Sequence, residues 1–326
     1  NYLMLIFFVL QTGLFAQKID RENLNQFLSF CDSTKADEIL LLHQNQIVTH
    51  WKRSHFQLLQ QKDSLRCHSP YFGTASMVKS WIGLLIGILI ENGKIRSVED
   101  YVCNYLPEWK IGCQNQITIR HLLMMTACFR RSGANGILSK ANMNEYALSL
   151  MPDTIPDVRF SYSNESVQIL GIMIERITQK PGDIVFEELL GKPLQMDSTT
   201  FAKDSAGNVI FYGGCLTTVT NASKIAQVML NQGMWKGNRI VSAQWIQSST
   251  TPGKLAPFYG FLWWIDRNSK YWNFAATGDL GQFTIVVPEL ELIYIRKQAC
   301  DLSAASVNMS WMGPAFLNRL CSVIKH

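Results

Sequence analysis

The sequence predicts an α+β fold in which helices flank an antiparallel sheet built from both chain ends, with a helical domain inserted between those ends. Three observations carry this prediction: a hairpin pattern near the start, helical periodicity through the middle, and short β-rich runs separated by turn residues in the final third. Strands that bracket a mostly helical middle are typical of α+β domains.

Residues 1–16 form a segment of a different kind. They contain the apolar run YLMLIFFVL at residues 2–10 and end at the small Ala16. Such a run is too short to span a bilayer and resembles the end of a secretory signal peptide. We therefore expect a signal-peptide remnant over residues 1–16 and export to the periplasm or the extracellular space, with no stable membrane insertion after its removal. A buried N-terminal strand or helix is the alternative.

Residues 17–326 are then expected to form the folded domain. Its first element is a hairpin, with apolar runs at 38–42 and 47–51 around a polar turn. A helix is expected over residues 76–91, because WIGLLIGILI lacks a polar face and Asn92-Gly93 suits a left-handed cap.

Further elements follow from caps, breakers and turn residues. Thr118 is a candidate N-cap for a helix that continues from it, and Pro181-Gly182 ends another helix over residues 165–178. The remaining expected helices cover 221–231, 242–249 and 304–324, and the expected strands cover 259–265, 270–275, 282–287 and 290–297. The inserted helical subdomain is expected over residues 97–220.

Composition excludes several functional classes. With 47% hydrophobic and 17% charged residues the chain is not a disordered segment, and its net charge of +5 is spread thinly, which argues against a nucleic-acid partner. The eight cysteines include no CxxC pair and no Cys/His cluster at metal-ligand spacing, so we expect neither a metal nor a cofactor. Cys103 and Cys113 are the nearest pair, although sequence alone leaves their pairing open.

The first candidate for chemistry is Ser76-Met-Val-Lys79 at the start of the buried helix. Side chains at positions i and i+3 share a helix face, so the Lys79 amine can reach the Ser76 hydroxyl. Burial lowers the pKa of a lysine, which lets it act as the base that a serine nucleophile needs. An N-cap serine with a surface lysine is the alternative, and the second S-x-x-K, Ser322 to Lys325, is interpreted as accidental.

The second candidate is Tyr162-Ser-Asn164, in the loop before the 165–178 helix. Residues two apart in an extended loop point the same way, so a proton-relaying tyrosine and an amide can enter one cleft. Ordinary turn chemistry before a helix is the alternative.

The third candidate is Ala276-Thr-Gly-Asp-Leu-Gly-Gln282, between two expected strands. Gly278 and Gly281 allow the backbone to approach a substrate closely, and an N–H group here can complete an oxyanion hole with that of Ser76. A glycine-containing hairpin turn is the alternative for this segment alone.

Together, S-x-x-K, Y-x-N and a T-G segment on a strand resemble the signature of serine β-lactamases and penicillin-binding proteins. The tyrosine in the second motif makes the chain most similar to class C β-lactamases, related D,D-carboxypeptidases and esterases, and 6-aminohexanoate-dimer hydrolases. The resemblance implies a β-lactamase/transpeptidase-like fold. It also implies that Ser76 is the acylated nucleophile, Lys79 its general base and Tyr162 the proton relay.

By the same resemblance, Asn164 orients substrate or lysine, and Thr277, Gly278 and Asp279 form the substrate and oxyanion side, with the Asp279 N–H joining that of Ser76. One departure matters: Ala276 stands where β-lactamases and penicillin-binding proteins carry a lysine or histidine that holds a substrate carboxylate. The segment after Thr126 also differs, reading Ala-Cys-Phe where relatives usually have Ser-Gly.

The leading functional hypothesis is therefore an exported serine hydrolase that transfers the acyl group of a small-molecule ester or amide to water in two steps. A D,D-carboxypeptidase or weak class C-like β-lactamase is the alternative within the fold, and an arginine near the pocket would favour it. A binding protein that has kept the fold without turnover is the alternative of another class.

Overall fold

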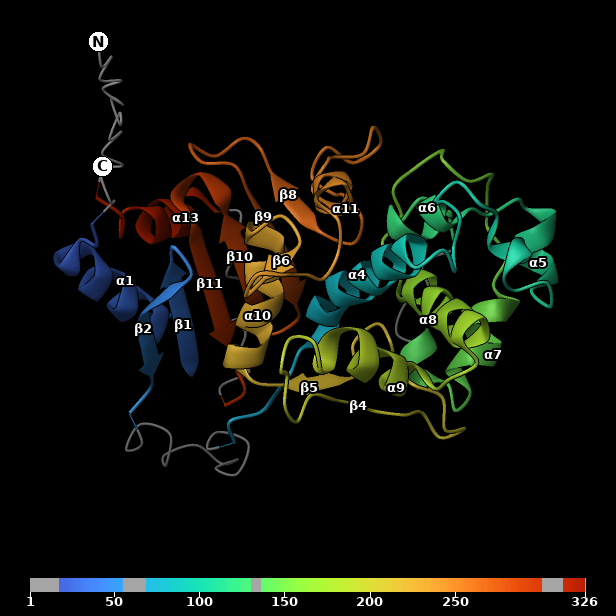
Figure 1. Ribbon diagram of the computed structural model, residues 1–326, viewed down its shortest axis with the longest axis horizontal. Coiled ribbons are helices and arrows are strands. Elements are labelled where there is room, and N and C mark those ends of the chain that lie inside the picture. Colours follow the sequence, from blue (N-terminus) through green and yellow to red (C-terminus); the bar gives the residue numbers. More distant parts are fainter. Residues whose placement is uncertain (1–17, 55–68, 130–135, 301–312, 326) are drawn as a thin grey trace, which may run out of the picture.

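The computed structural model describes residues 18–54, 69–129, 136–300 and 313–325 (Figure 1). The expected signal-peptide remnant lies outside the described residues. The central feature is a six-stranded antiparallel sheet in the order β2-β1-β11-β10-β9-β8. Its strands are β1 (Glu38–His43), β2 (Gln46–Lys52), β8 (Trp264–Asp266), β9 (Asn273–Gly278), β10 (Gln282–Val287) and β11 (Leu292–Lys297).

The sheet joins the two ends of the chain, as the sequence predicts. β1 pairs antiparallel with β11, and Leu40 lies opposite Ile295 in that register. The first strand of the chain therefore lies between its hairpin partner β2 and β11, a strand from the last third. This arrangement confirms the α+β class with an antiparallel sheet built from both chain ends.

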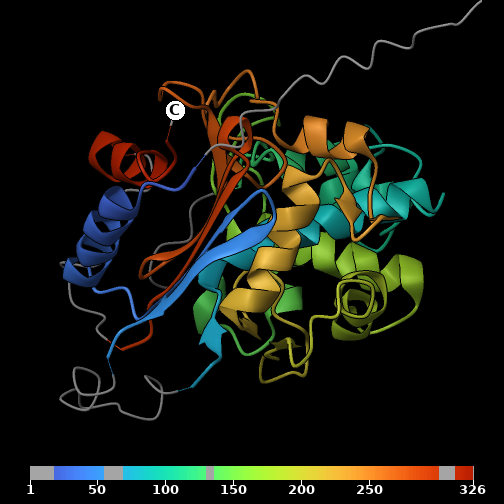
Figure 2. The same ribbon diagram turned by 60° about the vertical axis from the view of Figure 1, so that its left-hand side comes forward.

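Both faces of the sheet are covered by helices. Side chains alternate between the faces of a strand, so Leu41 and Tyr294 pack on one side while Leu40 and Ile295 pack on the other. Figure 2 shows α1 (Arg21–Ser33) and α13 (Pro314–Cys321) against the first face and α10 (Val219–Leu230) against the second. The sheet is therefore covered on both faces, and the end of β9, next to the edge strand β8, lies beside the candidate site.

A group of helices lies beside the sheet, on the side away from α1 and α13 (Figure 1). α4 (Val78–Glu91) runs into this group from the sheet, and Val78 to Leu89 are all buried, as its missing polar face predicts. The other helices are α5 (Lys110–Gln114), α6 (Ile119–Leu123), α7 (Met143–Ser149), α8 (Asn164–Thr178), α9 (Gly182–Phe186) and α11 (Ala243–Ser249). The boundary of an inserted subdomain at residues 97–220 stays an interpretation.

Two small sheets complete the described secondary structure. One has the order β3-β5-β4 and the other pairs β6 with β7. Their strands are β3 (Phe72–Gly73), β4 (Thr200–Phe201), β5 (Cys215–Thr217), β6 (Met234–Trp235) and β7 (Asn238–Arg239). β3 directly precedes the turn that carries Ser76, and β5 pairs with β3 beside that turn.

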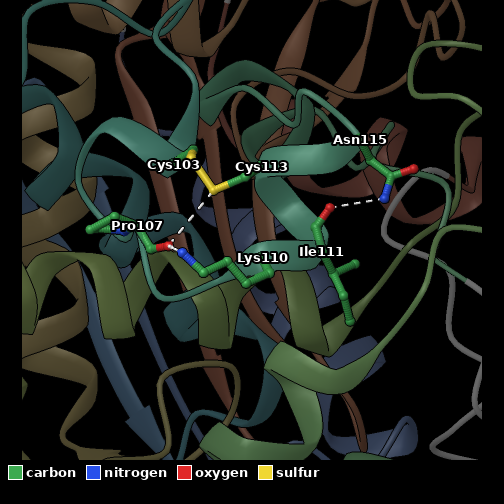
Figure 3. Close-up of a disulfide and its surroundings, with 6 residues drawn as sticks. All are labelled: Cys103, Pro107, Lys110, Ile111, Cys113 and Asn115. Carbon is green, nitrogen blue, oxygen red and sulfur yellow. Dashed lines mark hydrogen bonds between the residues drawn. A yellow bond between two sulfur atoms is a disulfide. The ribbon is translucent and has the colours of Figure 1, made fainter.

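Cys103 and Cys113 form a disulfide that closes the segment containing α5 (Figure 3). Within that segment the Lys110 amine donates a hydrogen bond to the Pro107 carbonyl over 3.1 Å, and the Asn115 amide donates one to the Ile111 carbonyl over 2.8 Å. Cys300 is also disulfide-bonded. The described thiols are buried: Cys31, Cys128, Cys215 and Cys321.

Several boundaries differ from those predicted. The helix after Thr118 ends at Leu123, since Met125 adopts a left-handed conformation with φ 58°. The strand expected over 259–265 is shortened to β8 because the chain turns at Leu262, where φ is 60°. α1 was not predicted. The last helix begins at Pro314 within the described residues, and residues 304–312 of its expected range lie outside them.

Candidate active site

Ser76 lies in a tight turn of 3₁₀ helix, η1 (Ala75–Met77), that leads directly into α4. The preceding Ala75 has φ 46°, a conformation that a residue with a side chain adopts only at a cost, so the surroundings hold this turn in place. Thr74 is one such anchor, because its N–H and its hydroxyl both donate to the Cys215 carbonyl, over 2.8 and 3.1 Å. The turn presents a serine at the N-terminus of a buried helix, where backbone N–H groups favour a developing negative charge.

Lys79 is the second residue of α4, about one turn after Ser76, and is 1% exposed. Its Nζ lies 2.7 Å from the Ser76 Oγ and 2.6 Å from the Tyr212 carbonyl oxygen. Burial lowers its pKa from 10.5 to about 7, an effect that the nearby Asp279 and Glu165 carboxylates oppose. A large fraction of Lys79 is therefore neutral near pH 7, and a neutral amine at this distance can accept the serine proton.

Tyr162 is the second side chain that contacts Ser76. Its phenol hydrogen-bonds with the Ser76 hydroxyl, and its ring centroid lies 5.2 Å from the Lys79 Nζ. Burial raises the pKa of Tyr162 to about 12, although the bond to Ser76 lowers it and Asp279 raises it further. The phenol is therefore protonated at neutral pH and is able to donate its proton.

The loop that carries Tyr162 is tied to the segment after α6. The Ser161 N–H donates to the Met125 carbonyl over 2.7 Å, and the Ser161 hydroxyl donates to the Phe129 carbonyl over 3.1 Å. Cys128, in the part of this segment that departs from the family, is buried and has φ 57°. The altered Ala-Cys-Phe segment therefore supports the tyrosine loop.

Asn164 is the first residue of α8, with Ser163 as the N-cap. Its side chain is half-buried and makes no hydrogen bond within the part of the chain that the structure describes. The side chain of Asn164 thus makes no hydrogen bond with Lys79. The Lys79 amine donates instead to the Tyr212 carbonyl. The role of Asn164 in holding a substrate stays a prediction.

The end of β9 reaches the serine turn through Gly278. A Cβ at this position would lie 2.2 Å from the Thr74 carbonyl oxygen and 3.1 Å from the Ala75 Cβ, so only glycine permits this approach. The segment Ala276–Gly278 belongs to the strand, and the turn starts at Asp279. This corrects the expectation that the whole third segment lies between strands.

The residues just before Gly278 on β9 alternate between the two faces of the sheet. Ala276 is buried on the same side of the sheet as α4, whereas Ala275 packs with α1 and α13. Alternation along the strand places the Thr277 side chain on the same face as Ala275, and its role in binding substrate stays a prediction. Asp279 is exposed, and its carboxylate acts on the pKa values of both Lys79 and Tyr162.

One residue that supports the Lys79 site was not predicted from the sequence. Gln168 of α8 is fully buried, and its amide binds the backbone of the segment before Tyr212: Nε2 donates to the Val209 carbonyl over 2.7 Å, and Oε1 accepts from the Phe211 N–H over 3.1 Å. This pair of bonds fixes the chain that presents the Tyr212 carbonyl to Lys79. In the sequence, Gln168 is a polar residue among apolar helix positions. That pattern is only a weak indication of a buried glutamine, and its partners become known only from the fold.

Arg296 is the arginine to weigh as a substitute for the missing cation at Ala276. It is fully buried on β11, one position from Ile295, which faces α4 and α10. Its guanidinium lies on the opposite face and donates to the Thr34 hydroxyl over 3.0 Å and to the Gln298 side chain over 2.8 Å. It therefore does not replace a cation at Ala276.

Two further properties concern the described residues alone. They contain no group of three or more His, Cys, Asp and Glu side chains that could hold a metal ion. Among the same residues, every helix is too short or too polar to cross a bilayer.

The sheet, the buried helix behind a serine turn and the lysine beside that serine define the class of β-lactamase-fold serine hydrolases. The chain belongs to the beta-lactamase family, whose model matches residues 70–296. This confirms the resemblance drawn from the motifs.

Individual relatives are distant. A 6-aminohexanoate-dimer hydrolase of Paenarthrobacter ureafaciens is 22% identical over 259 residues, which cover 68% of this chain and 64% of the relative. Protein flp of Staphylococcus aureus strain MW2 is 30% identical over 136 residues, 39% of this chain and only 27% of its own length. A solved structure from Bacillus anthracis, assigned as a 6-aminohexanoate-dimer hydrolase, superposes with a TM-score of 0.75 at 18% identity, over 90% of this chain and 80% of that one.

Proposed function

We propose that this protein is an exported serine hydrolase that cleaves an uncharged ester or small amide by two-step acyl transfer to water. The observation that carries the proposal is the 2.7 Å contact between the Ser76 hydroxyl and a lysine amine whose pKa lies at about 7. A buried lysine with a perturbed pKa beside a serine is costly to the fold and is typical of catalytic sites.

In the first step neutral Lys79 takes the proton from the Ser76 Oγ as that oxygen attacks the substrate carbonyl carbon. The developing oxyanion would be bound by the backbone N–H groups of Ser76 and Asp279, and the close approach of Gly278 to the Thr74 carbonyl and to Ala75 supports this pairing. Tyr162 gives its phenolic proton to the leaving alkoxide or amine and regains one from the Lys79 ammonium. The bond to the leaving group breaks and an acyl-Ser76 ester remains.

In the second step a water molecule attacks the acyl-Ser76 carbonyl. Lys79 and Tyr162 now act in reverse: they accept the water proton and return a proton to the Ser76 Oγ as it leaves. The products are the free carboxylic acid and an enzyme in its starting protonation state.

The electrostatics of the site favour an uncharged substrate. Ala276 provides no cation, Arg296 faces the other side of the sheet, and the Asp279 carboxylate is close enough to act on Lys79. A substrate carboxylate would meet repulsion there rather than a partner. The same features weigh against efficient D,D-carboxypeptidase or β-lactamase activity, which depends on such a carboxylate.

Two observations support the remaining parts of the proposal. The Cys103–Cys113 disulfide is typical of an oxidising compartment and agrees with export through the apolar segment at residues 2–10. The relative from Paenarthrobacter ureafaciens is named a hydrolase of 6-aminohexanoate dimers, and that name agrees with an amide as substrate.

Intact-mass spectrometry after exposure to a fluorophosphonate tests the proposal. We expect a single adduct on the wild-type protein and on Ser322→Ala, and none on Ser76→Ala. The Ser76→Ala protein should keep its thermal stability to within about 1 kcal/mol, because this half-buried hydroxyl adds little to the core. An unlabelled, folded wild-type protein would support the binding-protein alternative instead.

A further inference from the structure

A row of stacked aromatic rings leads away from the proposed catalytic tyrosine. The Tyr162 ring stacks on Trp264, with centroids 5.6 Å apart and planes 27° from parallel. Trp264 stacks in turn on Phe258, with centroids 6.2 Å apart and planes 16° from parallel. The three rings therefore form a continuous stack whose inner end is the phenol that hydrogen-bonds with Ser76.

Two further rings fix this stack from the side. Tyr259 is 1% exposed and meets Trp264 edge-on, with centroids 4.9 Å apart and an interplanar angle of 85°. Phe160 contacts Phe258 edge-on over 5.4 Å. Edge-to-face contacts of this kind are favourable and directional, so the stack is held rigid before any substrate binds.

The stack is only partly covered. Phe258, at its outer end, is 37% exposed, while Tyr162, Trp264 and Phe160 are half-buried. Single exposed apolar residues are ordinary. Here, however, the exposed Phe258 ring is the outer end of an aromatic stack whose inner end, Tyr162, contacts Ser76. Such a surface offers favourable contact to a flat apolar group of a substrate and a poor environment to a charged one.

The position of Tyr162 says which part of the substrate meets this surface. In the proposed mechanism its phenol gives a proton to the leaving oxygen or nitrogen, so the leaving group lies on the Tyr162 side of Ser76. The acyl group extends from the attacked carbon in another direction. The aromatic stack therefore borders the leaving group.

We propose that Tyr162, Trp264 and Phe258 form a subsite for a flat, uncharged, apolar leaving group, such as an aromatic alcohol or amine. This inference rests on the proposed function and adds the class of leaving group to it. Phe258 is then a specificity residue, because it is the member of the stack furthest from the reacting atoms.

The test compares benzyl acetate with ethyl acetate, whose leaving alkoxides differ little in basicity but differ in one aromatic ring. We expect kcat/KM to favour benzyl acetate, and Phe258→Ala to reduce that preference about fivefold, the value of one lost aromatic contact. Ethyl phenylacetate carries the ring on the acyl side, and its ratio to ethyl acetate should not change. Benzyl and ethyl acetamides repeat the comparison for an amidase.

Leu255→Ala is the matched control. Leu255 is 42% exposed in the same segment, but it lines a separate cavity of about 970 Å³ beside the far end of α4. Equal ratios in the two variants, no benzyl preference in the wild type, or a change confined to the phenylacetate ratio would each overturn the subsite while leaving an active hydrolase. A protein that takes no fluorophosphonate label and cleaves neither ester nor amide would overturn the proposed function, and the subsite with it.

Discussion

The chain contains the pattern S-x-x-K twice, and the two copies have different surroundings. At the start of α4, Lys79 is 1% exposed and its Nζ lies 2.7 Å from the Ser76 Oγ. Beyond the end of α13, the Ser322 hydroxyl donates to the Arg319 carbonyl over 2.9 Å, while the Lys325 side chain is 56% exposed and lies 3.8 Å from Asp20. The same spacing thus yields a serine–lysine contact in one place and two unrelated surface contacts in the other.

The difference arises from where each serine lies on its helix. Ser76 precedes a 14-residue helix, so the i,i+3 relation to Lys79 holds and both side chains share one helix face. Ser322 is the C-cap of α13, after which the chain leaves the helix and Lys325 no longer shares its face. The S-x-x-K spacing makes a serine–lysine contact possible. Whether the contact forms, and whether the pKa of the lysine is lowered, depends on where the serine lies on the helix and on burial.

Replacing the lysine of each S-x-x-K copy is expected to give the largest difference in kcat between the two copies. Lys79→Met should lower kcat for an ester by about 10³-fold, since proton transfer by a positioned base is worth roughly 10²–10⁴. Lys325→Met should leave kcat unchanged. Steady-state kinetics on one ester measures both, and a Lys79→Met enzyme within tenfold of the wild type would contradict the assignment of the base.

The same variant should gain stability while it loses activity. Lys79 has a folded pKa of about 7, below its unfolded value of 10.5, so the unfolded state binds more protons between these values. Its cost to folding therefore grows as pH falls from 10.5 to about 7 and is constant below. We expect Lys79→Met to melt above the wild type at pH 6, and by less at pH 10. Lys325→Met should show no such pH-dependent gain.

The second prediction concerns the pH profile of the wild-type enzyme. If neutral Lys79 is the base, kcat/KM should rise with pH through an apparent pKa of about 7. At pH 5 roughly one lysine in a hundred is then neutral, so kcat/KM should fall about 100-fold below its plateau. An activity that stays constant from pH 5 to pH 8 would mean that another group accepts the serine proton.

These contrasts also show what sequence could and could not predict. That Ser76, Lys79 and Tyr162 lie together could be predicted from the order and spacing of the motifs. The sheet could be predicted because its strands alternate or are uniformly apolar. The Tyr212 carbonyl and its support by Gln168 were missed, since a backbone acceptor leaves no residue-type signal. The strand expected over 259–265 was too long, because the left-handed turn at Leu262 occurs at a residue other than glycine.

The third prediction tests that missed support. Gln168→Leu should remove the two bonds that hold the segment before Tyr212 and so displace the carbonyl that binds Lys79. We expect kcat to fall about tenfold with little change in KM, because only the catalytic geometry is disturbed. Loss of the carbonyl also destabilises the ammonium, so the acid limb of the pH profile should shift to lower pH.

Gln227→Leu on α10 is the control for this substitution, since within the described residues the one hydrogen bond of its side-chain amide goes to the Ser223 carbonyl of its own helix. It should change neither kcat nor the pH profile. A Gln168→Leu enzyme whose loss of activity parallels its loss of folded protein, with an unshifted profile, would assign Gln168 a purely structural role.

The smallest effects are expected at the second copy itself. The segment from Ser322 to Lys325 holds the chain ends together through its backbone: the Ser322 carbonyl accepts from the Asn23 amide over 2.9 Å, and the Lys325 N–H donates to the Lys18 carbonyl over 2.7 Å. Substituting the two side chains, as in Ser322→Ala with Lys325→Gln, leaves these bonds in place. The exposed 3.8 Å ion pair contributes little, so the free energy of unfolding should change by less than about 0.5 kcal/mol. Chemical denaturation measures this, and a loss of activity in the double variant would mean that the second pattern is not accidental.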